Sequence, residues 1–330
     1  MGTRQVLATA AVFSLLLSAP ANAAPKLHFV KKIGVGSDSN QAWMSFVAFS
    51  PDGRRVASDG PATPGDVSGA LTIRRFPRGT LLKTLPGRPQ AVARNWRYYF
   101  DGKQVRDMTS GAPVLPVPDA QYETAAFSPD GAWIAVTSER APYNNHIEVL
   151  AVQGGRRIAV VGTHMASALA IDPRRAILAA GGWDIVTLWD LHSGKRLGAL
   201  HGIGRYVRSL AFSRDGRHLA AGTDLGGVQL WDVRRRRRLW SLKLDGGEVS
   251  EPAFGPDGRL VAVGVYGTGT AFLIDGRTGR LLDRKKISDI GCGAVAFSPD
   301  GRTLIAPSTG GLIEWPYDTG GTIRVFKVER

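Results

Sequence analysis

Short segments of alternating apolar and polar residues run along most of the chain, and this period-two pattern is typical of half-buried β-strands. Seven of the segments resemble one another and recur along the chain, at residues 72–76, 103–107, 147–151, 186–190, 228–232, 271–275 and 323–327. The pattern predicts an all-β protein built from repeated units, each with a strand at an equivalent place.

A turn motif precedes most of these strands by about 20 residues. It reads Ala48-Phe49-Ser50-Pro51-Asp52-Gly53 and recurs at 126–131, 211–216, 253–258 and 296–301, with a weaker copy at 170–175. The copies are about 40 residues apart, the length of a four-stranded propeller blade, except for one gap about twice as long. We therefore predict a degenerate unit at 88–118, with short strands at 90–94, 97–100 and 103–107.

Two units end their strand with the dipeptides Trp189-Asp190 and Trp231-Asp232. Together with the repeat period, these dipeptides make residues 24–330 similar to the WD-repeat (WD40) family, in an exported bacterial form. The resemblance implies a single all-β domain, a seven-bladed β-propeller of four-stranded antiparallel blades. The other units lack the dipeptide, and His201-Gly202 replaces the family's Gly-His pair before the fifth unit, so no subfamily is implied.

The two ends of the chain are expected to share the last blade. The final unit ends with its third strand at 323–328, whereas residues 27–33 resemble the fourth strands at 81–85 and 197–200. An N-terminal strand that completes the last blade closes the ring and leaves no open sheet edge there. The final unit also carries an insertion at 306–321, which contains Trp315 and Tyr317.

Residues 1–23 have the pattern of a secretory signal peptide. Arg4 precedes an apolar run at 6–17, and the small residues Ala21-Asn22-Ala23 fit a cleavage site before Ala24. The apolar run is shorter than the roughly 20 residues that cross a bilayer, so we expect no transmembrane segment. Cys292 is the single cysteine, which excludes an intrachain disulfide. We therefore expect a soluble periplasmic or secreted protein.

The candidate chemistry points away from catalysis. The six histidines show no metal-ligand spacing, and the aspartates of the Pro-Asp-Gly motifs are explained as turn residues. Neither a nucleophile elbow nor a phosphate-binding glycine loop is present. We predict no catalytic residue, no metal ligand, no cofactor and no enzymatic activity.

Binding is then the remaining class of function, and the predicted propeller offers two candidate faces for it. The face with the first-to-second and third-to-fourth strand turns is basic, in a chain of net charge +14, and its strongest feature is the run Arg234, Arg235, Arg236, Arg237 and Arg238. The opposite face gathers aromatic and arginine side chains of the kind that anchor protein interfaces. Its members are Trp43, Met44, Tyr122, Tyr143, Asn144, Trp183, Arg205, Tyr206, Tyr266, Trp315 and Tyr317. We predict that this aromatic rim binds the partner.

The leading hypothesis is a monomeric protein-interaction scaffold with a protein partner. An anionic envelope polymer is a further candidate for the basic face, and nucleic acid is disfavoured because an exported protein does not meet it. A propeller enzyme or ligand binder that uses the central channel is the alternative. A third is an envelope component similar to the TolB-type propellers, although residues 24–44 are too short for the N-terminal domain of that type.

Overall fold

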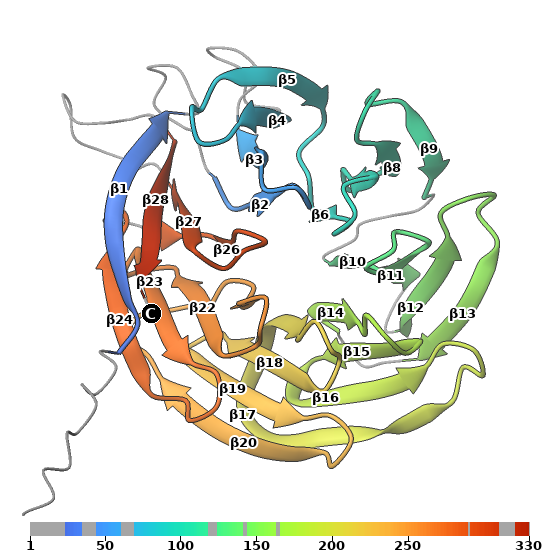
Figure 1. Cartoon of the computed structure of the whole chain (residues 1–330). Helices are drawn as coiled ribbons and strands as arrows, with labels where there is room; N and C mark the ends of the chain where they lie inside the picture. Colours follow the sequence, from blue (N-terminus) through green and yellow to red (C-terminus); the bar gives the residue numbers. More distant parts are fainter. Residues whose placement is uncertain are drawn as a thin grey trace, which may run out of the picture.

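The computed structural model describes residues 24–34, 44–60, 69–117, 124–140, 144–162, 166–289, 291–309 and 321–329, without the side chains of 138–140, 144, 145 and 309. Over these residues the regular structure is entirely β-strand, and the strands form antiparallel sheets arranged around a common centre (Figure 1). An all-β arrangement of this kind fits a β-propeller.

Four of the sheets have four strands each, in chain order. They are β2 (Val47–Phe49), β3 (Arg55–Gly60), β4 (Ala70–Arg75), β5 (Leu81–Pro86); β6 (Ala91–Val92), β7 (Tyr98–Phe100), β8 (Gln104–Asp107), β9 (Pro113–Pro116); β10 (Ala125–Phe127), β11 (Trp133–Arg140), β12 (Asn144–Ala151), β13 (Arg157–Gly162); and β21 (Ala253–Phe254), β22 (Leu260–Val265), β23 (Thr270–Asp275), β24 (Leu281–Lys286).

A larger sheet of seven strands joins two units through one long strand. Its strands are β14 (Ala168–Ile171), β15 (Ile177–Gly181), β16 (Trp183–Asp190), β17 (Arg196–Phe212), β18 (His218–Thr223), β19 (Gly227–Asp232) and β20 (Arg237–Lys243). β17 has 17 residues: its first part pairs with β16, up to Tyr206, and its last part pairs with β18, from Val207. It therefore serves as the outer strand of one unit and the inner strand of the next.

The remaining sheet combines the two ends of the described chain. It contains β25 (Gly291–Cys292), β26 (Ala296–Phe297), β27 (Thr303–Thr309), β28 (Thr322–Glu329) and β1 (Lys26–Gly34). β1 runs antiparallel to β28, from the pair Lys26 and Glu329 to the pair Gly34 and Thr322. The backbone N–H of Leu27 also donates a hydrogen bond of 2.7 Å to Asp283 Oδ2 on β24, so β1 is attached to the preceding sheet as well.

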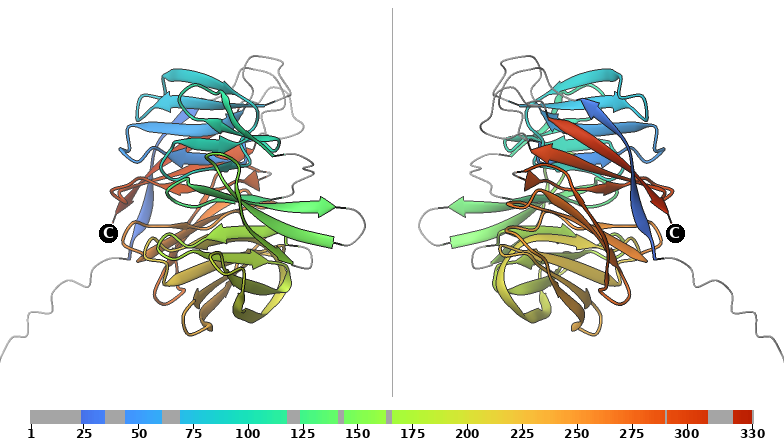
Figure 2. Two further views of the ribbon diagram at one scale, coloured as in Figure 1. Left: turned by 90° about the vertical axis from the view of Figure 1, so that its right-hand side faces the viewer. Right: turned by 90° about the vertical axis from the view of Figure 1, so that its left-hand side faces the viewer.

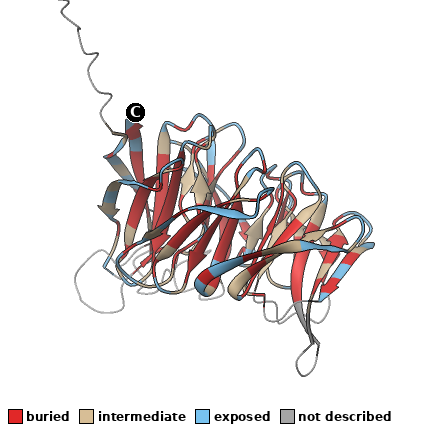
Figure 3. Ribbon diagram, turned by 90° about the horizontal axis from the view of Figure 1, so that it is seen from below, coloured by how far each residue is buried: buried red, intermediate tan, exposed pale blue. Residues whose placement is uncertain are grey.

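Inner strands of successive units touch around the centre (Figure 1). The contacts run from β6 to β10, β10 to β14, β14 to β17, β17 to β21, β21 to β26, and β26 to β2. The hydrophobic core lies between the sheets: each cluster of buried side chains draws its members from two adjacent units. Figure 3 shows this burial along the strands, with exposed residues mainly at the connections. Side chains of each unit are thus buried by its neighbours on both sides.

Each unit has two distinct ends. In the antiparallel order, the first-to-second and third-to-fourth turns share one end, which we call the turn face; the second-to-third and unit-to-unit connections share the other, which we call the rim face. Backbone hydrogen bonds join the two turns of a unit, for example Phe76 N to Arg54 O at 2.8 Å and Val233 N to Arg217 O at 3.0 Å. The sequence-based assignment of turns to two ends is therefore geometrically consistent.

The predicted strands can be compared with these elements directly. The seven recurrent segments coincide with β4, β8, β12, β16, β19, β23 and β28, and the degenerate unit is confirmed as β6 to β9. Its turn has the same geometry from different residues: Asn95 Oδ1 accepts the N–H of Arg97 at 2.9 Å, as Asp52 does for Arg54, and Trp96 adopts the positive φ of 59° that glycine supplies in the regular motif. The predicted insertion begins later than expected, because residues up to Thr309 belong to β27; residues 310–320 lie outside the described part.

Candidate functional site

The predicted rim residues divide into those that the structure describes and those that it does not. Trp43, Tyr122, Tyr143, Trp315 and Tyr317 lie outside the described residues, as does the side chain of Asn144. Trp183, Arg205, Tyr206 and Tyr266 are described and lie on the rim face. The assignment of Met44 to an exposed rim is wrong, because this side chain is fully buried in the cluster between the first and last sheets.

Trp183 is the most exposed large apolar side chain among the described residues, at 61% of its full surface. Its backbone is nevertheless fixed in the tight connection between β15 and β16. Asp184 has a positive φ of 60°, and its Oδ1 accepts the N–H of Gly204 at 2.5 Å. Gly182 also donates to Ile185 O at 2.9 Å and accepts from Val207 N at 3.0 Å. The connection that carries Trp183 is therefore fixed, and it presents the indole to solvent.

Neighbouring side chains extend this exposed surface along the rim face. Tyr206 is the register partner of Trp183, and the two ring centroids are 6.2 Å apart. The guanidinium carbon of Arg208 lies 5.1 Å from the centroid of the Tyr206 ring, a cation–π distance. Arg208 Nε is also 3.6 Å from Glu248 Oε2 on the connection to β21. Arg205 is exposed beside Tyr206.

Tyr266 lies on the rim face of the next sheet. Its N–H donates to Glu248 O at 2.9 Å, and its carbonyl accepts the N–H of Gly247 at 3.0 Å. Burial raises the pKa of Tyr266 to about 12, with Asp59 adding to the effect, so the phenol stays protonated at physiological pH. We call Trp183, Tyr206, Arg208, Glu248 and Tyr266 the rim cluster. The structure thus brings the rings of Trp183 and Tyr206 together and joins Tyr266 to Glu248 through the backbone.

Sequence reasoning missed two members of the rim cluster, Arg208 and Glu248. A signal for Arg208 was present, because it follows Tyr206 by two residues in a strand and so lies on the same side of it. Glu248 had none, since it comes from a connection whose path depends on the packing of two sheets.

A second missed feature is the carboxylate of Asp59, which is fully buried near the rim face. It accepts the N–H groups of Ser45 at 3.0 Å and Phe46 at 2.8 Å, the Ser45 hydroxyl at 2.7 Å, and Arg88 Nε at 3.1 Å. These bonds attach the segment before β2 and the connection before β6 to β3. The available signal was an aspartate inside an otherwise buried strand, a position that requires several donors.

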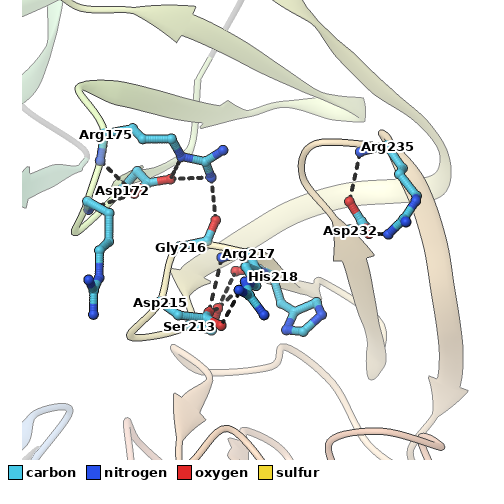
Figure 4. A network of polar contacts seen from close by, with 10 residues as sticks. Asp172, Arg175, Ser213, Asp215, Gly216, Arg217, His218, Asp232 and Arg235 are labelled. Atoms are coloured by element: carbon cyan, nitrogen blue, oxygen red, sulfur yellow. Dashed lines mark hydrogen bonds and ion pairs between the residues drawn. The ribbon is translucent and has the colours of Figure 1, made fainter.

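On the turn face, the five-arginine run is exposed but largely engaged within the chain. Arg235 pairs with Asp232 at 2.9 Å (Figure 4), Arg236 donates to Leu197 O at 2.9 Å, and Arg238 donates to Gly202 O at 2.9 Å. The last two bonds reach β17, so they fasten β20 and the turn before it to the neighbouring outer strand segment. These contacts reduce the number of guanidinium groups with full freedom to meet a polyanion.

Figure 4 shows how the turn face also links adjacent units. Asp172 is buried and accepts Arg174 N at 2.8 Å, while its Oδ2 pairs with Arg175 at 2.7 Å; Arg175 in turn donates to Gly216 O at 2.5 Å. Asp172 thus replaces the serine of the regular turn motif in the weak copy. The connection is structural, and we assign it no binding role.

Charged side chains also lie toward the centre of the ring. Arg94, from the turn after β6, donates a hydrogen bond of 3.4 Å to Phe212 O at the end of β17, which belongs to a different sheet. Burial lowers the pKa of Arg94 and raises that of Glu251, and each of the two charges favours the ionised form of the other. Both side chains are nevertheless exposed to solvent.

Within the described part of the chain, no group of three or more histidine, cysteine, aspartate or glutamate side chains converges to hold a metal ion. The same residues contain no helix of the length and apolar character needed to cross a membrane.

Comparison with known families gives one match. Residues 194–232 match the family model described as WD domain, G-beta repeat. The matched segment contains β17, β18 and β19 and ends at Trp231-Asp232. No curated protein matches the chain. Residues 194–232 thus have the sequence of a WD repeat, and this match supports placing the protein with the WD40 family.

Proposed function

We propose that the protein is an exported, seven-bladed WD-repeat propeller that binds a protein partner through the rim cluster and catalyses no reaction. The observation that carries the proposal is Trp183, a 61% exposed indole on a conformationally fixed connection. WD40 repeats generally mediate protein interactions, and the matched repeat contains Tyr206 and Arg208.

The count of seven blades rests on how the described sheets pack. The seven-stranded sheet is treated as two blades that share β17, and the other sheets contribute one blade each. Each hydrophobic cluster then fills the space between two successive blades, including the cluster of Ile33, Met44 and Val325 between the last and the first. β1 acts as the outer strand of the last blade and closes the ring.

The choice of the rim cluster rests on side-chain chemistry. Tryptophan, tyrosine and arginine dominate the energetics of protein interfaces, because the rings bury a large area at a small cost in conformational entropy and the guanidinium makes several directed hydrogen bonds. Trp183 and Arg208 are held by neighbours before any partner arrives, which lowers the entropy lost on association.

The test is a partner-binding measurement on two matched variants. Trp183→Ala removes the central exposed ring, and Leu239→Ala removes an exposed apolar side chain on the outer strand β20. A partner captured from the native cell envelope is identified, purified and titrated against both. We expect Trp183→Ala to weaken binding by about 2 kcal/mol, or about 30-fold, with little change for Leu239→Ala. Equal affinities for wild type and Trp183→Ala would overturn the choice of site.

Export is tested independently by the N-terminus of the protein. We expect mass spectrometry of the periplasmic or secreted protein to find a chain that starts at Ala24. Full-length protein confined to the cytoplasm would contradict this proposal and would bring nucleic acid back as a partner for the basic face.

A second candidate function is supported by the charged groups near the centre. Arg94 and Glu251 come from different sheets, are exposed to solvent, and each favours the ionised form of the other, and an exposed pair of opposite charges can contact a small charged ligand. Thermal denaturation with added inorganic phosphate is the first test. A rise in Tm that disappears in Arg94→Gln would favour this function, whereas no rise would remove phosphate as a ligand.

A further inference from the structure

The closing strand β1 exposes two consecutive apolar side chains. Phe29 is 53% exposed and Val30 is 56% exposed. A β-bulge lies between Phe29 and Lys31, so Val30 has no register partner on β28. The bulge displaces the alternation that would turn one of two successive residues inward. As a result both side chains reach solvent at the outer flank of the ring, where β1 lies beside β28 (Figure 2).

Basic residues surround this pair. β1 carries Lys26, Lys31 and Lys32 and no carboxylate. The neighbouring strand β24 ends with Arg284, Lys285 and Lys286, and it is attached to β1 by the bond from Leu27 N to Asp283. All three β24 cations have an acidic partner: Arg284 pairs with Asp245 at 3.7 Å, Lys285 with Asp283 at 3.3 Å and Lys286 with Asp289 at 3.5 Å. Glu329, on β28, pairs with His28 of β1 at 3.0 Å. The three lysines of β1 therefore give this surface its net positive charge. We call the exposed residues of β1 and β24 the β1–β24 wall.

Protection of a free sheet edge explains only part of this surface. Lysines and bulges on an outer strand prevent it from pairing with another chain. Two adjacent exposed apolar side chains act in the opposite direction, because they favour association. Such a pair recurs in β5, where Leu81 is 47% and Leu82 is 43% exposed, but β5 carries only Lys83 as a charged residue. The combination of apolar pair and basic flanks belongs to the β1–β24 wall.

We propose that the β1–β24 wall docks on an anionic phospholipid surface. Phe29 and Val30 enter the interfacial region, and the flanking lysines and arginines lie against lipid phosphates. Charge complementarity selects this occupant, since an apolar pair flanked by cations matches an apolar layer beneath an anionic one. The proposal goes beyond the rim cluster and is independent of it, because the two surfaces lie on different parts of the ring and share no residue.

The experiment is co-sedimentation of the full chain with vesicles of phosphatidylcholine alone or mixed with phosphatidylglycerol. We expect binding only to the mixed vesicles. Lys26→Gln with Lys32→Gln should lower the partition coefficient about 25-fold, because each lysine near an anionic surface contributes about fivefold. Phe29→Ser with Val30→Ser should lower it about twentyfold. Every variant has the same N-terminus, so any contribution of residues 1–23 is common to all.

Three controls make the result decisive. Val30→Ser alone, expected to reduce partitioning about fivefold, avoids loss of the Phe29 packing on Phe326. Leu81→Ser with Leu82→Ser removes a similar apolar pair from β5 and should have no effect. Replacement of Arg234–Arg238 by serine removes more charge than the lysine variant, yet should change partitioning less.

Two outcomes would overturn the lipid proposal. If the arginine replacement weakens binding as much as the lysine variant, diffuse charge accounts for the attraction. If the lysine variant weakens binding while both apolar variants bind normally, the wall binds polyanions without insertion, and a soluble acidic polymer becomes the occupant.

Discussion

The hydroxyl of Ser298 organises an entire turn at the scale of a single residue. It donates to Asp300 Oδ1 at 2.6 Å and accepts the N–H of Thr303 at 2.9 Å, while Asp300 accepts the N–H of Arg302 at 3.0 Å. Ser50, Ser128 and Ser213 form the same network, and Figure 4 shows the copy with Asp215. The repeated serine, aspartate and glycine are thus explained by the hydrogen bonds of the turn. The sequence pattern predicts the same role for these aspartates, as turn residues.

These turns predict that the protein loses stability in acid. The bond from the Ser298 hydroxyl, followed by that from Arg302 N–H, holds the pKa of Asp300 below its ordinary value of 3.8; Ser50 does the same for Asp52. A carboxyl whose pKa is lowered by folding stabilises the protein above its unfolded pKa, and this stability is lost as the pH falls through the folded pKa. Urea unfolding should therefore show a free energy of unfolding that declines from about pH 4 downward.

Ser298→Ala provides the matched residue-scale prediction. The free energy of unfolding at pH 7 should fall by about 1 kcal/mol, because a nearly buried hydroxyl loses its bonds. The acid decline should also become shallower, since the pKa of Asp300 returns toward its unfolded value. An unchanged pH profile in the variant would contradict the assignment of this hydrogen bond as the main cause.

At the scale of elements, β17 places the rim cluster. In the described sheets with four strands, separate strands fill the outer place of one unit and the inner place of the next, whereas β17 does both without a break. Its continuous backbone brings Tyr206 beside Trp183 and carries Arg208 toward Glu248. One continuous strand therefore positions Tyr206 and Arg208 before a partner binds, which lowers the entropy lost on association.

β1 gives the element-scale prediction. Leu27 is 1% exposed and packs with Leu260, Leu304 and Phe326 between the last two units. Leu27→Ala should lower the free energy of unfolding by about 3 kcal/mol, because it leaves a cavity in that cluster. Lys26→Ala, on the adjacent exposed position, should change it by less than about 0.5 kcal/mol. Chemical denaturation of both variants is the measurement, and equal stabilities would show that β1 contributes little to the fold.

The whole molecule has two faces that should respond differently to salt. An interaction through the Arg234–Arg238 run should weaken steeply as ionic strength rises, because the Debye length falls from about 10 Å at 0.1 M to about 3 Å at 1 M. Binding through the rim cluster should change little. With a partner in hand, a salt titration of the wild type, Tyr206→Ala and a five-serine replacement of the run separates the two.

For that titration, we expect Tyr206→Ala to lower affinity at all salt concentrations and the five-serine variant mainly to slow association. The structure strengthens this expectation, because Arg235, Arg236 and Arg238 already bond within the chain. A large affinity loss in the five-serine variant, with none in Tyr206→Ala, would show that the turn face carries the partner.

The sequence by itself determined the local features of this protein. The period-two pattern located the strands, and Pro-Asp-Gly located the turns, because both depend on interactions among residues close in the chain. Even the degenerate unit was found by its spacing, although Asn95 and Trp96 replace the usual turn residues.

Only the tertiary structure decided which distant residues meet. Arg208 joins Tyr206 to Glu248, Asp59 collects donors from two connections, and Met44 is buried by the last sheet, against expectation. The five arginines looked free in sequence, but Arg236 and Arg238 bond to β17. These contacts depend on how successive sheets pack around the ring. Local sequence patterns specify the strands of a sheet but do not specify the side chains that its neighbours bring against it.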